Sequence, residues 1–144
     1  MKKIRTGVWE TNSSSCHSVS VSSSGDYTSI TPNASGSIII PSQGFGWEQE
    51  TYNDPLSKLS YLCIYVRDWA REQNRARYFS QIWETVVDHT HCYNVSFAGE
   101  DDGSGYIDHQ SVESNDLDWI FEDKKIKDFV FDRGSYIETD NDNH

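Results

Sequence analysis

The chain has 144 residues, enough for one domain, and its 12 basic against 23 acidic residues give a net charge of −11 at neutral pH. Such a charge repels nucleic-acid phosphates and anionic membrane surfaces, so we expect no direct nucleic-acid binding and no membrane association. No apolar run approaches the roughly 18 residues that a membrane span needs. Aromatic residues make up 13% of the chain, so rings must fill much of the core.

The three cysteines, Cys16, Cys63 and Cys92, cannot all pair with one another. The opening "MKKIRTGVWE" lacks the apolar segment of a secretory signal. We therefore expect a reducing, cytoplasmic environment.

The first part of the chain predicts strands. "KKIRTGVW" and "HSVSVS" both alternate in polarity, which is typical of half-buried strands. In the second, Val19 and Val21 are expected to face the core and Ser18, Ser20 and Ser22 the solvent. "ETNSSSC" between them is rich in turn formers, and "SIIIP" predicts another short strand.

Two helices follow. Asn53 or Asp54 can cap the first, and Pro55 suits its first turn. Apolar residues continue at helical spacing in both segments. The first helix would bury Leu56, Leu59, Leu62, Cys63, Val66 and Trp69, and the second Phe79, Ile82, Trp83, Val86 and Val87. We interpret Arg67, Arg71, Arg75 and Arg77 as a solvated helix end.

The remainder of the chain predicts a hairpin from "YNVSF" to "YIDH", a short helix in "SNDLDWIFEDKK", and a last hairpin in "FVFDRGSYIET". No linker divides the chain. The sequence therefore predicts one α+β domain over residues 1–144, with two main helices packed on one face of a mostly antiparallel sheet.

Several short blocks carry a resemblance. "GVWETNSSSCHS" resembles the opening R-x-G-x-F-E-T-N-S-S-S-S-H-S of a family of proteins from bacteriophages and their bacterial hosts. "FGWE", "KLSYL", "YIDHQS" and "ETDNDN" are similar to further blocks of that family, although Trp9, Cys16 and Asp140 depart from its pattern. The resemblance implies a phage or prophage setting in the bacterial cytoplasm, and an accessory factor that acts on host machinery.

Polar residues near both ends and in the "YIDHQS" block form the candidate site. Carboxylates and imidazoles of this kind exchange protons with water or bind a divalent metal, provided that folding brings them together. The catalytic candidates are Glu10, His17, Asp108 and His109; the metal candidates are His17, His109, Asp140 and Asp142; the binding candidates are Asn12, Ser13, Ser14, Ser15, Trp47, Glu48 and Gln110. In the alternative interpretation, these side chains only close turns.

The aromatic residues Phe45, Trp47 and Tyr52 also allow two interpretations. They form either an exposed recognition patch or, as we favour, a staple that closes the first helix onto the sheet.

Three functions fit these features. The first is a non-enzymatic accessory protein that binds and blocks a host protein, such as part of a defence system, through an acidic face, in the manner of an anti-CRISPR protein. The second is a small hydrolase, metal-assisted or not, and the third a structural protein of the virion. The enzyme requires its candidate residues around one hollow, whereas the binder requires a surface.

Overall fold

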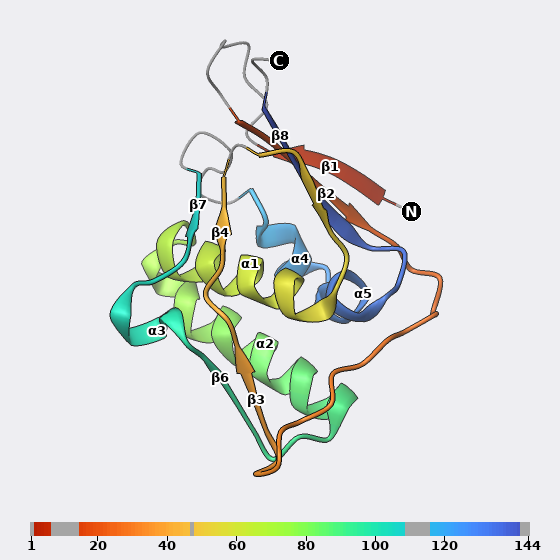
Figure 1. The fold of residues 1–144 in the computed structure, drawn as a ribbon, viewed down its shortest axis with the longest axis vertical. Coiled ribbons are helices and arrows are strands. Elements are labelled where there is room, and N and C mark those ends of the chain that lie inside the picture. The colour runs from red at the N-terminus through yellow and green to blue at the C-terminus, as the bar shows by residue number, and fades with distance from the viewer. Residues whose placement is uncertain (1, 7–14, 47, 109–115, 142–144) are drawn as a thin grey trace.

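The protein is an α+β domain, as predicted, in a computed structural model that describes residues 2–6, 15–46, 48–108 and 116–141. Figure 1 shows the arrangement of its elements. The strands are β1 (Lys2–Thr6), β2 (Ser15–Val21), β3 (Ser37–Ile40), β4 (Gly44–Phe45), β5 (Glu50–Tyr52), β6 (Asn94–Phe97), β7 (Tyr106–Ile107) and β8 (Tyr136–Asn141). The helices are α1 (Pro55–Asp68), α2 (Glu72–Thr90), α3 (Gly99–Asp102), α4 (Asp118–Glu122) and α5 (Ile126–Phe131).

The main sheet is antiparallel and has the strand order β1-β2-β8-β5. β2 pairs with β8 so that His17 lies opposite Thr139, and β8 pairs with β5 on its other side. Segments from near the two ends of the chain therefore lie side by side in the sheet (Figure 1). This pairing positions the candidate site, because it brings His17 to the loop before β5.

The predicted hairpin over residues 93–109 is wrong, because β6 and β7 pair with other strands. β6 pairs in parallel with β3, and β7 pairs in parallel with β4. The short helix α3 lies between them. Ile38, Ile40 and Phe97 are at most 4% exposed in this arrangement. Parallel pairing places their apolar side chains in the core, a gain that a short surface hairpin would not offer.

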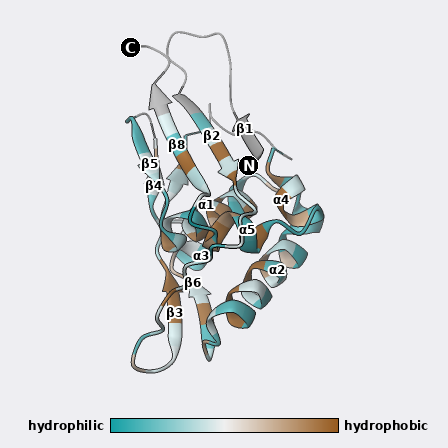
Figure 2. Ribbon diagram, turned by 90° about the vertical axis from the view of Figure 1, so that its right-hand side faces the viewer, coloured by the Kyte–Doolittle hydropathy of each residue, from teal (hydrophilic) through white to brown (hydrophobic). Residues whose placement is uncertain are grey.

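α1 lies at the centre of the fold (Figures 1 and 2), with its residues from Ser57 to Val66 all buried. The predicted cap is confirmed, since the carboxylate of Asp54 accepts a hydrogen bond from the Ser57 amide. A helix buried on every side needs partners for its polar groups. The Lys58 ammonium group donates to the carbonyls of Asp132 and Ser135. The Ser60 hydroxyl accepts a hydrogen bond from the Gln43 amide. The hydroxyl of Tyr61 is hydrogen-bonded to His17, and that of Tyr65 donates to Asp118.

The second predicted helix is confirmed as α2, although its apolar stripe is only partly buried. Ile82 and Val86 are fully buried, whereas Phe79 and Trp83 are half-buried and stack with ring centroids 5.5 Å apart. Val87 is 37% exposed. α2 therefore covers α1 with one narrow face and shows apolar surface beside it.

None of the described helices combines the length and apolar character needed to cross a bilayer.

The prediction that Arg67 belongs to a solvated helix end is wrong. Its guanidinium donates to the carbonyls of Gly99, Ser104 and Gly105 at 2.8, 2.6 and 2.9 Å. The side chain thereby attaches the segment of residues 99–105, which contains α3, to α1. A planar group with several N–H donors suits such convergent carbonyls, and sequence spacing gives no sign of them.

The solvent-facing role expected for the β2 serines is also wrong. Ser18, Ser20 and Ser22 are 2%, 0% and 8% exposed. β2 lies between β1 and β8, with Glu138 opposite Ser18 and Tyr136 opposite Ser20. Short side chains on an interior strand are shielded by longer cross-strand neighbours, so a polar residue there need not be exposed to solvent.

The final predicted hairpin is replaced by a helix and a strand. The residues "FVF" form the second half of α5, and Phe129, Val130 and Phe131 are fully buried. The chain turns after Asp132, whose carboxylate accepts from the Gly134 amide at 2.9 Å. The short helix predicted before it is confirmed as α4.

Candidate functional site

The floor of the candidate site is the strand β4 and the residue after it. Gly44 and Gly46 alternate with Phe45, so Phe45 enters the core, with no exposed surface, and both glycines turn the other way. Phe45 packs edge-to-face on Tyr52 and Tyr61, with centroids 5.0 and 4.9 Å apart. The staple interpretation of Phe45 and Tyr52 is therefore the one that the packing supports.

The ring of Tyr106, on the neighbouring strand β7, lies along these two glycines. A Cβ atom at Gly44 would overlap the ring at Cε1 and lie 2.9 Å from Cζ. A Cβ at Gly46 would lie 3.2 Å from the hydroxyl oxygen of the same tyrosine. Tyr106 can occupy this position only because the strand beneath it carries no side chain at Gly44.

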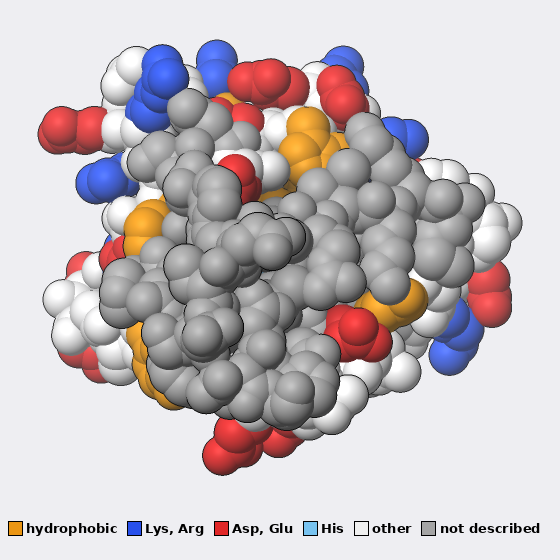
Figure 3. Space-filling view, turned by 90° about the horizontal axis from the view of Figure 1, so that it is seen from above, with side chains coloured by type: hydrophobic (Ala, Val, Ile, Leu, Met, Phe, Trp, Pro, Cys, Tyr) orange, Lys and Arg blue, Asp and Glu red, His pale blue; other side chains and the backbone are white. Residues whose placement is uncertain are grey.

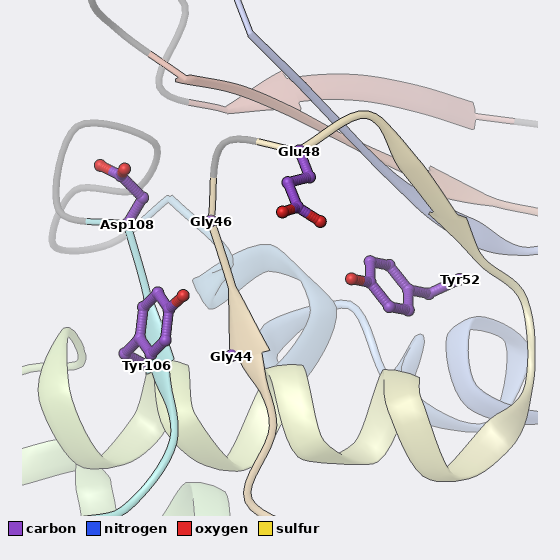
Figure 4. A pocket seen from close by; sticks show the side chains of 6 residues that line it. All are labelled: Gly44, Gly46, Glu48, Tyr52, Tyr106 and Asp108. Atoms are coloured by element: carbon purple, nitrogen blue, oxygen red, sulfur yellow. The ribbon is translucent and has the colours of Figure 1, made fainter.

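A hollow of about 570 Å³ opens above this floor. Tyr106 and Asp108 border it from β7 and its end, and Glu48 and Tyr52 border it from β5 and the segment before it (Figure 4). Thr139, on β8, fixes this segment by donating its hydroxyl to the Glu48 carbonyl at 2.6 Å. The main sheet therefore holds one wall, and the β4–β7 pair holds the other.

The electrostatic character of the hollow is acidic. In Figure 4 the Glu48 carboxylate and the Tyr52 hydroxyl point toward the space above β4, whereas the Asp108 carboxylate points away from it. The described lining residues include no lysine or arginine. Burial, followed by the negative charges of Glu50 and Glu48, raises the pKa of Tyr52. The same negative field favours a cation in the hollow.

His17 lies behind this floor and is fully buried. Its Nε2 lies 3.0 Å from the Gly46 carbonyl oxygen, and its Nδ1 lies 2.9 Å from the Tyr61 hydroxyl. Burial lowers the pKa of His17, against the opposing effects of the Gly46 carbonyl and the Asp108 charge. The neutral ring therefore donates from Nε2 to the carbonyl, which can only accept, and accepts the Tyr61 proton at Nδ1.

The structure brings three of the predicted site residues together. His17, Glu48 and Asp108 all lie around Gly46: His17 bonds its carbonyl, and the other two border the same hollow. Ser15 and Asp140 lie on paired strands, with Cys16 opposite Asp140. The remaining candidates lie outside the described residues: Glu10, Asn12, Ser13, Ser14, Trp47, His109, Gln110 and Asp142.

No group of three or more histidine, cysteine, aspartate or glutamate side chains within the described residues is arranged to hold a metal ion. The proposed metal ligands His109 and Asp142 are outside that part of the chain. The metal hypothesis therefore stays a prediction.

The residues that sequence reasoning missed are Gly44, Gly46 and Tyr106. The alternation "GFG" is a signal in principle, because glycines two apart in a strand clear one whole face. From the sequence we interpret the aromatic residues of this segment, and not its glycines. Tyr106 could not be assigned to it, because the parallel partner of β4 is 62 residues away.

The fold and site define an α+β protein with an open hollow lined by acidic and tyrosine side chains. No protein-family profile matches the sequence, and there is no match among curated proteins or solved structures.

Proposed function

We propose that this chain is a non-enzymatic accessory protein that binds a partner protein through the hollow above β4. The observation that supports this proposal is the convergence of Glu48, Tyr52 and Tyr106 on one open space without a basic residue among the described lining residues. Such a space suits a cationic group on a partner surface. In the phage or prophage setting, the partner would be a host protein that is blocked by this contact.

The charge of the whole chain supports the same class of partner. A net charge of −11 steers a basic surface toward the protein and disfavours nucleic acid. Figure 3 shows acidic side chains at separate places around the rim of one face, with basic ones between them. The described residues around this rim therefore carry charges of both signs.

A hydrolase is the competing proposal, and one observation favours it. His17, Asp108 and Glu48 do gather around Gly46, as a hydrolytic site would require. However, both ring nitrogens of His17 are hydrogen-bonded inside the protein, and the ring is fully buried. A general base must reach the proton that it removes, and this geometry gives His17 a structural task instead.

The test is capture from lysate of a bacterial host, followed by identification of the captured protein and measurement of its affinity. E48Q and Y106L alter the hollow, whereas E100Q and Y93L alter an exposed glutamate and an exposed tyrosine elsewhere. We expect the affinity for the purified partner to fall about tenfold or more in E48Q and Y106L, with salt reducing wild-type binding. The two control variants should bind like the wild type.

Equal binding by all four variants would exclude the hollow as the contact. The hydrolase makes a different prediction, namely a rise in melting temperature on adding a divalent metal ion, because a ligand that binds only the folded state stabilises it. A metal-dependent rise that is lost in D108N would favour that alternative.

A further inference from the structure

Tyr106 presents an aromatic ring that lies against the backbone of β4. The ring rests against Gly44 and Gly46, and yet the residue is 57% exposed. Exposed tyrosines normally move among several rotamers, but here one side of the ring is backed by a strand without side chains. The other side is left as a flat platform at the edge of the hollow.

The hollow also offers hydrogen-bond acceptors, because Glu48 and Tyr52 line it together with Tyr106. Glu48 is exposed and directs its carboxylate into the space that Tyr52 borders from the same wall (Figure 4). Tyr52 is half-buried and experiences the charges of Glu50 and Glu48. A planar donor in the hollow would thus find a carboxylate and a phenol oxygen among the groups that line it.

We propose that the hollow seats the guanidinium group of an arginine side chain of the partner protein, stacked on Tyr106 and paired with Glu48. The inference rests on the proposed function, because the arginine belongs to the partner. Guanidinium groups are planar, stack on aromatic faces and donate two parallel hydrogen bonds to one carboxylate.

Arginine fits these features better than lysine for two physical reasons. An ammonium group is a compact and strongly hydrated charge, so an open hollow of about 570 Å³ would leave it largely in water. A guanidinium is less strongly hydrated and gains from lying flat on a ring. The flat ring of Tyr106 therefore favours binding of a planar cation over binding of a spherical one.

The experiment titrates the 144-residue chain with N-acetyl-arginine amide and, separately, with N-acetyl-lysine amide, and follows binding by backbone amide chemical shifts. We expect the arginine probe to shift resonances of residues 44–46, 48–52 and 106–108 and to bind at least about fivefold more tightly than the lysine probe. Y106L and E48Q should each weaken arginine binding about five- to tenfold, whereas Y93L and E100Q should not.

Equal affinity for the two probes, or arginine binding that Y106L leaves unchanged, would overturn the inference. So would a complete lack of shifts at the hollow with either probe. Y106L and E48Q alter exposed side chains, and their far-UV circular dichroism and melting temperature will show that they fold.

Failure of this inference can be distinguished from failure of the proposed function. If E48Q and Y106L lose the purified partner but the probes show no arginine preference, the hollow recognises another group and the proposed function stands. If the arginine probe binds as expected but all variants hold the partner equally, the hollow is a guanidinium site and the proposed partner contact is wrong.

Discussion

The Tyr61 hydroxyl, on the central helix, donates a hydrogen bond of 2.9 Å to Nδ1 of His17, on strand β2. The other ring nitrogen of His17 donates to the carbonyl of Gly46, directly below the hollow. One imidazole therefore connects the main sheet, the central helix and the strand that forms the floor of the site. We interpret His17 as a positioning residue for Gly46 and for the Glu48 segment that follows.

Tyr61→Phe tests this connection. The substitution keeps the ring that packs on Phe45 and removes the hydroxyl that serves a buried nitrogen. We expect the free energy of unfolding, measured by urea denaturation, to fall by about 1–3 kcal/mol. Tyr93→Phe alters a tyrosine that is 89% exposed and should change it by less than about 0.5 kcal/mol. Equal stability of the two variants would contradict the role given to this hydrogen bond.

Gly44→Ala tests the glycine floor. The new methyl group would overlap Cε1 of Tyr106, so the ring must leave its platform, and we expect arginine-probe binding to weaken about as much as in Y106L. Gly46→Ala is the matched control, because its methyl group would lie 3.2 Å from the hydroxyl at the far end of the same side chain. We expect binding to weaken less in this variant. The chemical shifts of Tyr106 report the displacement, and an unmoved ring in G44A would contradict the prediction.

Lys58 gives the protein a specific alkaline pH dependence. Its ammonium group is fully buried and donates to the carbonyls of Ser135 and Asp132. Burial lowers its pKa from 10.5 to about 8, although Asp54 and Asp132 act in the opposite direction. Between about pH 8 and 10.5, the unfolded chain holds a proton that the folded chain has lost. Raising the pH through this window therefore favours the folded state.

The measurement is the difference in free energy of unfolding between wild type and Lys58→Met at pH 7.5, 9 and 10.5. Using a difference removes the opposite contribution of Cys63, whose thiol pKa is raised by burial. We expect the free energy of unfolding of the wild type, relative to that of the variant, to rise by up to about 3 kcal/mol across this window. A difference that does not change with pH would show that Lys58 titrates normally.

Arg67→Met tests the attachment of residues 99–105, the segment that contains α3, to α1. The variant keeps aliphatic bulk but loses the donors to Gly99, Ser104 and Gly105, so three carbonyls lose a charged partner. We expect a loss of about 1–3 kcal/mol and faster amide exchange across residues 99–105. Arg77→Met removes an exposed arginine whose side chain bonds Asn74 within α2, and it should leave exchange in that segment unchanged.

Local patterns predicted much of the architecture. Asp54 and Pro55 define the start of α1, and the alternation of Val19 and Val21 defines β2, because capping and polarity period act within a few residues. Where the prediction failed, a distant partner decided the structure. Phe129 and Phe131 alternate as in a strand, yet they form part of the helix α5 in the core.

The chemical groups of the site can be identified from the sequence: a strongly acidic chain, the carboxylates Glu48 and Asp108, the histidine at position 17, and glycines on either side of Phe45. Their arrangement cannot, because folding places His17 behind the floor and Tyr106 on it. Both positions depend on pairing between strands far apart in the chain, β2 with β8 and β4 with β7. Such pairing is chosen by the burial of the whole core, which no short stretch of sequence encodes.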